Sequence, residues 1–126
     1  MRRRLLLVDD EPAIRLLCRV NLPLAGFDVV EESAGGDALA RARREPFDLA
    51  LLDVMMPGMS GFELAEQLHA DERTAALPIV FLSARADRSD VRRGFELGAV
   101  DYVTKPFDPL QLGSRLHTVL ARLEDQ

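Results

Sequence analysis

The chain has 126 residues, of which 48% are hydrophobic and 29% are charged, and these proportions exclude a disordered or collagen-like protein. Its formal net charge is −5 and its basic residues form no long run, which argues against direct binding of nucleic acid or of an anionic membrane. Cys18 is the single cysteine, so no intramolecular disulfide is possible, and no apolar run approaches the roughly 20 residues of a membrane-spanning helix. We expect one cytoplasmic domain over residues 1–126.

Five short apolar runs predict the strands of one sheet. They cover residues 5–8, 27–30, 49–52, 79–82 and 100–103, mostly without apolar–polar alternation, so we expect strands buried on both faces. Apolar or small residues at helical spacing follow each run: Ile14, Leu17 and Cys18; Ala38, Leu39 and Ala42; Gly61, Leu64, Ala65 and Leu68; Val91 and Phe95; Leu112, Leu116, Val119, Leu120 and Leu123. We therefore predict a single doubly wound α/β domain with a five-stranded parallel sheet and five helices on its two faces.

Local signals mark several helix ends. Asp10-Glu11-Pro12 places acids before a proline in the first turn, and Ser60-x-x-Glu63 is a capping-box pattern. Pro23 removes a backbone donor, so the first helix should stop or kink near Asn21.

Polar side chains lie at the predicted carboxyl ends of four strands, where open parallel sheets bind their ligands. They are Asp9, Asp10, Asp53, Ser83 and Lys105. Three carboxylates at neighbouring strand ends would repel one another without a cation, and a donor set lacking histidine and thiolate favours Mg²⁺ over zinc. Each acid also has a simpler interpretation, because Asp9 and Asp10 are typical helix caps and Asp53 is a typical turn residue.

Lys105 is the only lysine in the chain, and the other basic residues are all arginine. A composition that uses arginine wherever a cation is sufficient suggests that this one position needs a compact, flexible ammonium. We interpret Lys105 as a functional residue beside the carboxylates.

The complete set resembles the receiver domain of two-component response regulators, which has the flavodoxin-like fold of the chemotaxis regulators. Three motifs carry the resemblance, in the same order and each at a predicted strand end: LVDDEP at 7–12, DVMMPGMSG at 53–61 and GAVDYVTKPF at 98–107. The resemblance spans essentially the whole chain and implies the strand order 2-1-3-4-5.

The resemblance assigns a role to each polar residue. It implies that Asp53 is the phosphoacceptor, that Asp9, Asp10, Asp53 and the backbone carbonyl of Met55 hold Mg²⁺, and that Lys105 reaches the phosphoryl oxygens. The donor would be a phosphohistidine on a sensor histidine kinase or a phosphotransfer protein. Metal and ammonium would then neutralise charge on the transferring phosphoryl group.

Further residues match the positions through which the family switches. Ser83 corresponds to the switch hydroxyl, Ala84 is small enough to leave the acceptor accessible, and Tyr102 matches the aromatic residue that swings inward. The resemblance also makes the Lys105–Pro106 bond a candidate cis peptide.

The output face of the family comprises the fourth helix, fifth strand and fifth helix. Regulators with winged-helix output domains dimerise there through charge pairs, of which Asp101 and Arg115 match whereas Val91, Val100 and Gln111 do not. We expect a monomer or a weak phosphorylation-dependent dimer. The downstream target or output domain is unknown, and this chain shows no output domain.

Two alternatives remain. Haloacid-dehalogenase-like phosphatases also combine a strand-end Asp with Mg²⁺, but they usually carry a general-acid Asp two residues further on, where Met55 cannot transfer protons. The other alternative is a binding module that no longer accepts phosphate, although every polar position that the family expects is filled. We expect a signalling domain that undergoes phosphorylation and autodephosphorylation rather than a turnover enzyme.

Overall fold

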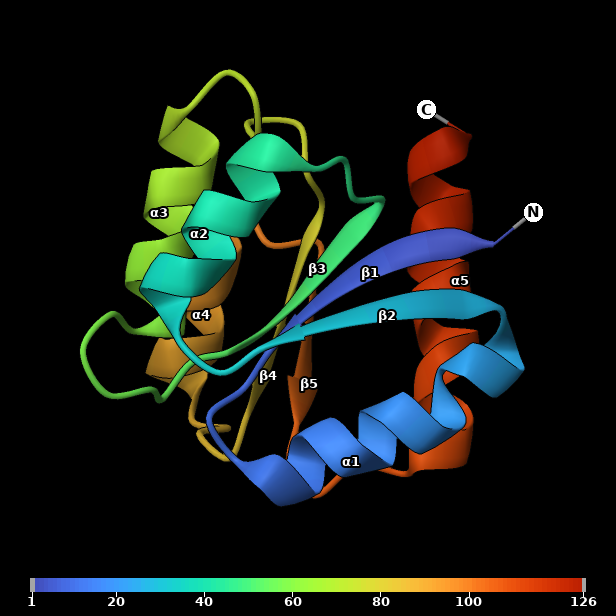
Figure 1. Cartoon of the computed structure of the whole chain (residues 1–126). Coiled ribbons are helices and arrows are strands. Elements are labelled where there is room, and N and C mark those ends of the chain that lie inside the picture. Colours follow the sequence, from blue (N-terminus) through green and yellow to red (C-terminus); the bar gives the residue numbers. More distant parts are fainter. Residues whose placement is uncertain (1, 126) are drawn as a thin grey trace.

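Five strands and five α-helices alternate along residues 2–125, which the computed structural model describes. The strands form one sheet in which all neighbours are parallel, in the order β2-β1-β3-β4-β5 (Figure 1). This confirms the predicted fold and strand order. The elements are β1 (Arg3–Val8), α1 (Pro12–Asn21), the 3-10 turn η1 (Pro23–Ala25), β2 (Phe27–Glu32), α2 (Gly35–Arg44), β3 (Leu49–Asp53), α3 (Gly61–Ala70), β4 (Ile79–Ser83), α4 (Arg88–Glu96), β5 (Asp101–Thr104) and α5 (Pro109–Glu124).

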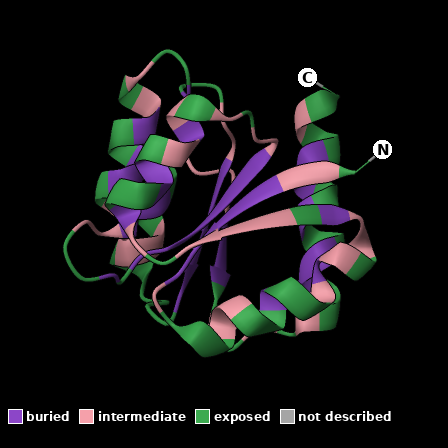
Figure 2. Ribbon diagram, viewed as in Figure 1, coloured by how far each residue is buried: buried purple, intermediate pink, exposed green. Residues whose placement is uncertain are grey.

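Helices cover the sheet on both sides. Figure 1 shows α1 and α5 on one face and α2, α3 and α4 on the other. Successive strand residues point to opposite faces, so Leu5 and Leu7 pack with Cys18 under α1 and α5, while Leu6 and Val8 pack under α2 and α3. The central strands are buried on both faces, as their unbroken apolar runs predict (Figure 2).

The strands extend beyond the predicted apolar runs. Backbone pairing continues through polar residues, since Val8 pairs with Glu32 and Ser83 pairs with Thr104. At the fifth strand the prediction was one residue early, because the strand begins at Asp101 rather than Val100. Asp53 and Ser83 are therefore the last residues of their strands rather than loop residues.

Two apolar residues that the helical spacing placed toward the core face solvent instead. Leu17 is 39% exposed. Ile14, Cys18 and Leu22, spaced four residues apart, face the sheet, so Leu17 lies at the side of the helix. Phe95 is 48% exposed, because the buried residue of α4 is Gly94. A Cβ atom there would lie 3.0 Å from the rings of both Phe81 and Tyr102, so the glycine allows α4 to approach the sheet closely.

The predicted helix ends are confirmed at two places. Helix α1 ends at Asn21 and gives way to the 3-10 turn at Pro23. Ser60 and Glu63 form the reciprocal capping box at the start of α3. Within residues 2–125, none of the helices combines the length and the apolar character that a membrane crossing requires.

Candidate functional site

The predicted site residues converge at the carboxyl end of the sheet. Asp9 follows β1, Asp53 ends β3, Ser83 ends β4 and Lys105 follows β5. Because these four strands are neighbours in the sheet, their ends bring together residues that are far apart in sequence. Asp9, Asp53 and Ser83 are all buried.

The three carboxylates form a compact oxygen cluster. One oxygen each of Asp9, Asp10 and Asp53 can be chosen such that all lie within 4.8 Å of one another. Asp9 Oδ1 accepts a hydrogen bond from the Glu11 N–H, whereas the buried Oδ2 atom accepts none from the described residues. A buried carboxylate oxygen without a hydrogen bond, in an all-oxygen cluster, fits a hard divalent cation such as Mg²⁺.

The helix-cap interpretation of Asp9 and Asp10 is not what the structure shows. The N-cap residue of α1 is Glu11, and no side-chain capping bond is present among the described residues there. Asp10 therefore remains available to the cluster.

Lys105 places its ammonium among three carboxylates. Its Nζ atom lies 2.8 Å from Glu11 Oε1, 3.0 Å from Asp9 Oδ2 and 3.5 Å from Asp53 Oδ1, and its side chain is only 9% exposed. The contact with Asp9 lacks hydrogen-bond geometry, so within residues 2–125 Glu11 alone accepts a hydrogen bond from Nζ. Sequence reasoning missed Glu11 as a site residue, because nothing in the pattern indicates a contact across 94 positions of the chain.

Burial and neighbouring charge shift the protonation of both central groups. Burial, followed by the negative charge of Asp9, raises the pKa of Asp53 to about 7, although the Lys105 ammonium opposes this rise. Burial alone would lower the pKa of Lys105, but the hydrogen bond to Glu11 and the negative charges of Asp9 and Asp53 outweigh it and raise that pKa. Lys105 therefore stays charged, whereas Asp53 without a metal holds its proton to a higher pH than an ordinary aspartate does.

This raised pKa predicts that metal-free stability depends on pH. Between the ordinary pKa of 3.8 and the folded-state value of about 7, the folded chain holds a proton on Asp53 that the unfolded chain has lost. The free energy of unfolding should therefore fall as pH rises through this window. Asp53→Asn removes the titration, so in EDTA its Tm should exceed that of the wild type near pH 8 by a margin that shrinks toward pH 4. Equal Tm values at pH 8 would contradict the shift.

Ser83 and Tyr102 are bonded to the same loop residue. The Arg85 N–H donates to Ser83 Oγ at 3.0 Å, and the Tyr102 hydroxyl donates to the Arg85 carbonyl at 2.6 Å. The Tyr102 ring is buried and packs near Phe81, so it occupies an inward position. Movement of the Ser83 hydroxyl would therefore alter its hydrogen bond with the Arg85 backbone and, through that backbone, the hydrogen bond of Tyr102.

The remaining predicted residues surround the acceptor. The Met55 N–H donates to Asp53 Oδ1 at 3.3 Å, while the Met55 side chain is exposed. Ala84 is exposed beside Ser83, and the Lys105–Pro106 bond is cis, as the resemblance implies. A hollow of about 470 Å³ adjoins the site and is lined by Val54, Met55, Met56, Pro57, Ser60, Phe62 and Arg85.

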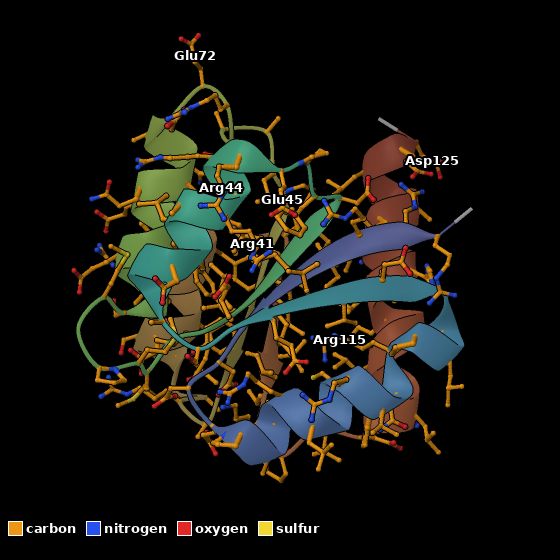
Figure 3. The ribbon with its side chains drawn as sticks, in the orientation of Figure 1. Arg41, Arg44, Glu45, Glu72, Arg115 and Asp125 are labelled. Atoms are coloured by element: carbon orange, nitrogen blue, oxygen red, sulfur yellow. The ribbon has the colours of Figure 1, made fainter. Side chains whose placement is uncertain are left out.

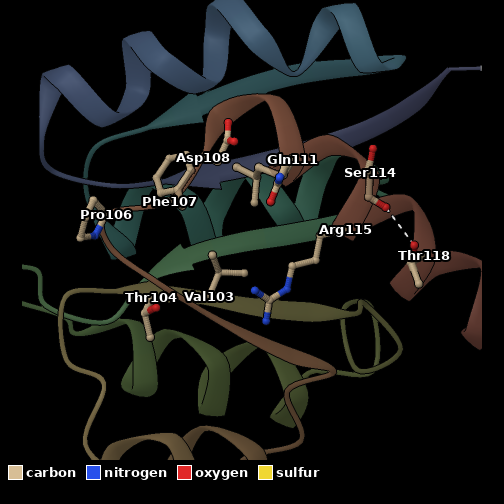
Figure 4. A pocket seen from close by; sticks show the side chains of 10 residues that line it. Val103, Thr104, Pro106, Phe107, Asp108, Gln111, Ser114, Arg115 and Thr118 are labelled. Atoms are coloured by element: carbon tan, nitrogen blue, oxygen red, sulfur yellow. Dashed lines mark hydrogen bonds between the residues drawn. The ribbon is translucent and has the colours of Figure 1, made fainter.

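A second hollow, of about 440 Å³, lies between β5 and α5 (Figure 4). Asp9, Asp10 and Asp53 do not line it. Arg115 reaches across it to pair with Asp101, with Nε 2.7 Å from Oδ2, and its Nη2 donates to the Tyr102 carbonyl at 3.1 Å. The Tyr102 N–H donates to Asp101 Oδ1 at 2.8 Å. The pair therefore occupies both backbone groups of Tyr102 at the free edge of the sheet, within one chain.

Comparison with known proteins places this geometry in a family context. The family model described as "Response regulator receiver domain" matches residues 5–117. The alkaline phosphatase synthesis transcriptional regulatory protein PhoP of Bacillus subtilis is 41% identical, with 98% of this chain and 51% of PhoP covered. The DNA-binding response regulator MtrA of Mycolicibacterium smegmatis is 43% identical, with 100% of this chain and 54% of MtrA covered.

A solved structure of the chemotaxis protein CheY4 of Vibrio cholerae superposes with a TM-score of 0.88 at 32% identity, covering 94% of this chain and 99% of CheY4. The chain thus matches a chemotaxis regulator over nearly the full length of both proteins. In contrast, it spans about half the length of the curated relatives that it matches.

Proposed function

The chain belongs to the response regulator receiver domain family, and from that membership we propose that Asp53 accepts a phosphoryl group from a phosphohistidine of a sensor kinase or phosphotransfer protein. The observation that carries this proposal is the convergence of Asp53 with two further carboxylates and the single ammonium of Lys105 at one end of the sheet. Receiver domains are signalling proteins, and we propose that this one hydrolyses only its own acyl phosphate, with no turnover of an external substrate.

Asp53, Lys105 and Ser83 have different roles in the phosphoryl transfer. An oxygen of the Asp53 carboxylate attacks phosphorus, the P–N bond breaks with its electron pair going to the histidine nitrogen, and a solvent proton satisfies that nitrogen. The Lys105 ammonium donates hydrogen bonds to the phosphoryl oxygens, which carry the developing charge. Ser83 Oγ–H provides a further donor once it turns toward the phosphoryl group.

Asp9, Asp10, Asp53 and the backbone carbonyl of Met55 would hold Mg²⁺. When bound, the metal neutralises negative charge around the transferring phosphoryl group. The Oδ2 atom of Asp9, which accepts no hydrogen bond from the described residues, and the purely oxygen donor set support this assignment.

An apolar stripe on α1 supports a protein donor. Leu16, Leu17 and Val20 are exposed on this helix, which begins beside the acidic cluster. Adjacent exposed apolar side chains are typical of protein–protein contact surfaces. A donor protein that covered this stripe would lie on the helix that begins directly after Asp9 and Asp10.

The matched relatives are about twice as long as this chain. The names of PhoP and MtrA describe transcriptional and DNA-binding regulators. For this acidic chain we propose that any effect on DNA is indirect, through a protein target or output domain that contacts α4, β5 and α5. We also propose a monomer or a weak phosphorylation-dependent dimer, because Val91, Val100 and Gln111 stand where dimers of the family carry charged residues.

The test of the proposed function is incubation with Mg²⁺ and acetyl phosphate, followed by intact-mass measurement. We expect the mass of one phosphoryl group to be added, and the adduct to be lost in mild base, as an acyl phosphate is. An unchanged mass under saturating donor and metal would overturn the proposal. Release of phosphate from many unrelated esters would favour the phosphatase alternative, which the thioether of Met55 at the general-acid position disfavours.

Asp10→Asn should weaken Mg²⁺ binding by about tenfold or more, because it removes a charged oxygen from a site whose other ligands cannot compensate. Binding is followed by titration calorimetry, and Asp125→Asn, an exposed acid beyond the end of α5, serves as the matched control. Unchanged Mg²⁺ affinity in the Asp10 variant would remove Asp10 from the ligand set.

A further inference from the structure

Glu11 forms a hydrogen bond with Lys105 at the edge of the site. The resemblance to receiver domains assigns no role to Glu11. Its Oε1 atom accepts a hydrogen bond from Lys105 Nζ at 2.8 Å, although the Glu11 side chain is 56% exposed and the Lys105 side chain only 9%. Glu11 occupies the N-cap position of α1 but makes no capping bond with the described residues. Its carboxylate is therefore committed to the ammonium rather than to the helix end.

The Lys105 ammonium lies closer to Glu11 than to the acceptor. Charge-assisted hydrogen bonds between an ammonium and a carboxylate are about 2.7–2.9 Å long, a length that Lys105 reaches with Glu11. Nζ also lies 3.0 Å from Asp9 Oδ2, in a contact without hydrogen-bond geometry, and its distance to Asp53 Oδ1 is longer, at 3.5 Å. The hydrogen bond of Lys105 is thus directed to Glu11 at the rim of the site and not to the Asp53 carboxylate.

We propose that Glu11 is a positioning residue that holds Lys105 at the rim of the unphosphorylated site and loses this contact when a phosphoryl group forms on Asp53. The inference rests on the proposed function and deepens it, because it assigns a residue that sets how readily the phosphorylated state forms. Each phosphorylation must break the Glu11–Lys105 bond, so this bond favours the unphosphorylated state.

Two substitutions separate the contact from the charge. Glu11→Gln keeps the side-chain length but replaces the carboxylate with a neutral, weaker acceptor. Glu11→Asp keeps the charge but shortens the side chain by one methylene, which withdraws the carboxylate from Nζ and should weaken the hydrogen bond. Glu72→Gln is the matched control, since Glu72 is exposed in the loop after α3 at the opposite end of the molecule (Figure 3).

The first measurement is the dissociation constant of beryllium trifluoride, an anion that mimics a phosphoryl group on a carboxylate, at saturating Mg²⁺. Tyr102 is the only tyrosine and the chain has no tryptophan, so intrinsic fluorescence reports on one residue near the site. We expect both Glu11 variants to bind the mimic about threefold more tightly than the wild type, the scale of a partly exposed ion pair. Glu72→Gln should bind it as the wild type does. Tighter binding by Glu11→Gln alone would show an effect of net charge and would overturn the positioning role.

The second measurement observes the ammonium itself. Lys105 is the only lysine, so protein labelled with ¹³C,¹⁵N-lysine gives one set of Cε and Nζ signals. Without the mimic, these signals should differ between the wild type and Glu11→Gln. With the mimic bound they should coincide, because the contact has been lost in both proteins.

The two failures are distinguishable. Lysine signals that still differ in the bound state would show that Glu11 keeps Lys105 after activation, which overturns the inference and leaves the acceptor role of Asp53 intact. Identical signals in the absence of the mimic would show that the contact is not formed, with the same consequence. A wild-type protein that neither binds the mimic nor gains a phosphoryl group would overturn the proposed function and the inference together.

Discussion

Asp53→Asn is expected to reduce phosphorylation by acetyl phosphate by on the order of a thousandfold or more, to the background of the assay. The carboxamide has almost the same size and shape as the carboxylate but cannot attack phosphorus to form an acyl phosphate. Asp53 is buried at the end of β3, where an isosteric side chain keeps the packing. The loss should therefore occur in a folded protein, as circular dichroism and intact mass together would show.

The matched control is Asp28→Asn, which removes an exposed acid in β2, an edge strand of the sheet. This variant should gain one phosphoryl group at the wild-type rate. If Asp53→Asn acquired the same base-labile adduct as the wild type, another carboxylate would be the acceptor. Asp9 and Asp10 would then be the first residues to test, because they share the cluster.

The sheet could be predicted because its signal is local. Uninterrupted apolar runs such as Leu49 to Leu52 indicate strands buried on both faces, and the alternation of strands with helices fixes parallel pairing. The ends of the strands were predicted less well, since Glu31 and Glu32 belong to β2 through backbone pairing with Leu7 and Val8. Hydropathy does not detect such pairing.

The composition of the site was predictable for a related reason. Once the strands are assigned, Asp9, Asp53 and Ser83 must lie at one end of the sheet, whatever the exact helix geometry. Glu11 was not predictable, because its bond to Lys105 depends on how the start of α1 lies against the turn after β5. Likewise, the exposure of Phe95 depends on the close approach of Gly94 to two rings, which helical spacing alone does not show.

Gly61→Ala is expected to destabilise the protein and to distort the acceptor strand. Gly61 is the first residue of α3, and a Cβ atom there would lie 2.1 Å from the backbone oxygen of Asp53 and 2.9 Å from Val54 Cα. Both contacts are with backbone, so no side-chain rotation relieves them and either α3 or the end of β3 must shift. Overpacking of this kind costs about 2–3 kcal/mol. Because the end of β3 carries Asp53, a shift of this strand end would also lower the rate of phosphorylation.

The sign of the change in unfolding free energy shows whether the close approach of α3 to Asp53 is its cause. Alanine is a better helix former than glycine by roughly 1 kcal/mol, so helix propensity alone predicts that Gly61→Ala stabilises the protein. Gly36 provides the matched control, because it lies in the first turn of α2 and its Cβ would meet no described atom within 4 Å apart from its chain neighbours and the backbone of its own helix. In urea unfolding we expect Gly36→Ala to raise the free energy of unfolding by about 0.5–1 kcal/mol and Gly61→Ala to lower it. If both alanines stabilised the protein equally, α3 would not press against Asp53, and the position of the acceptor would depend on the sheet alone.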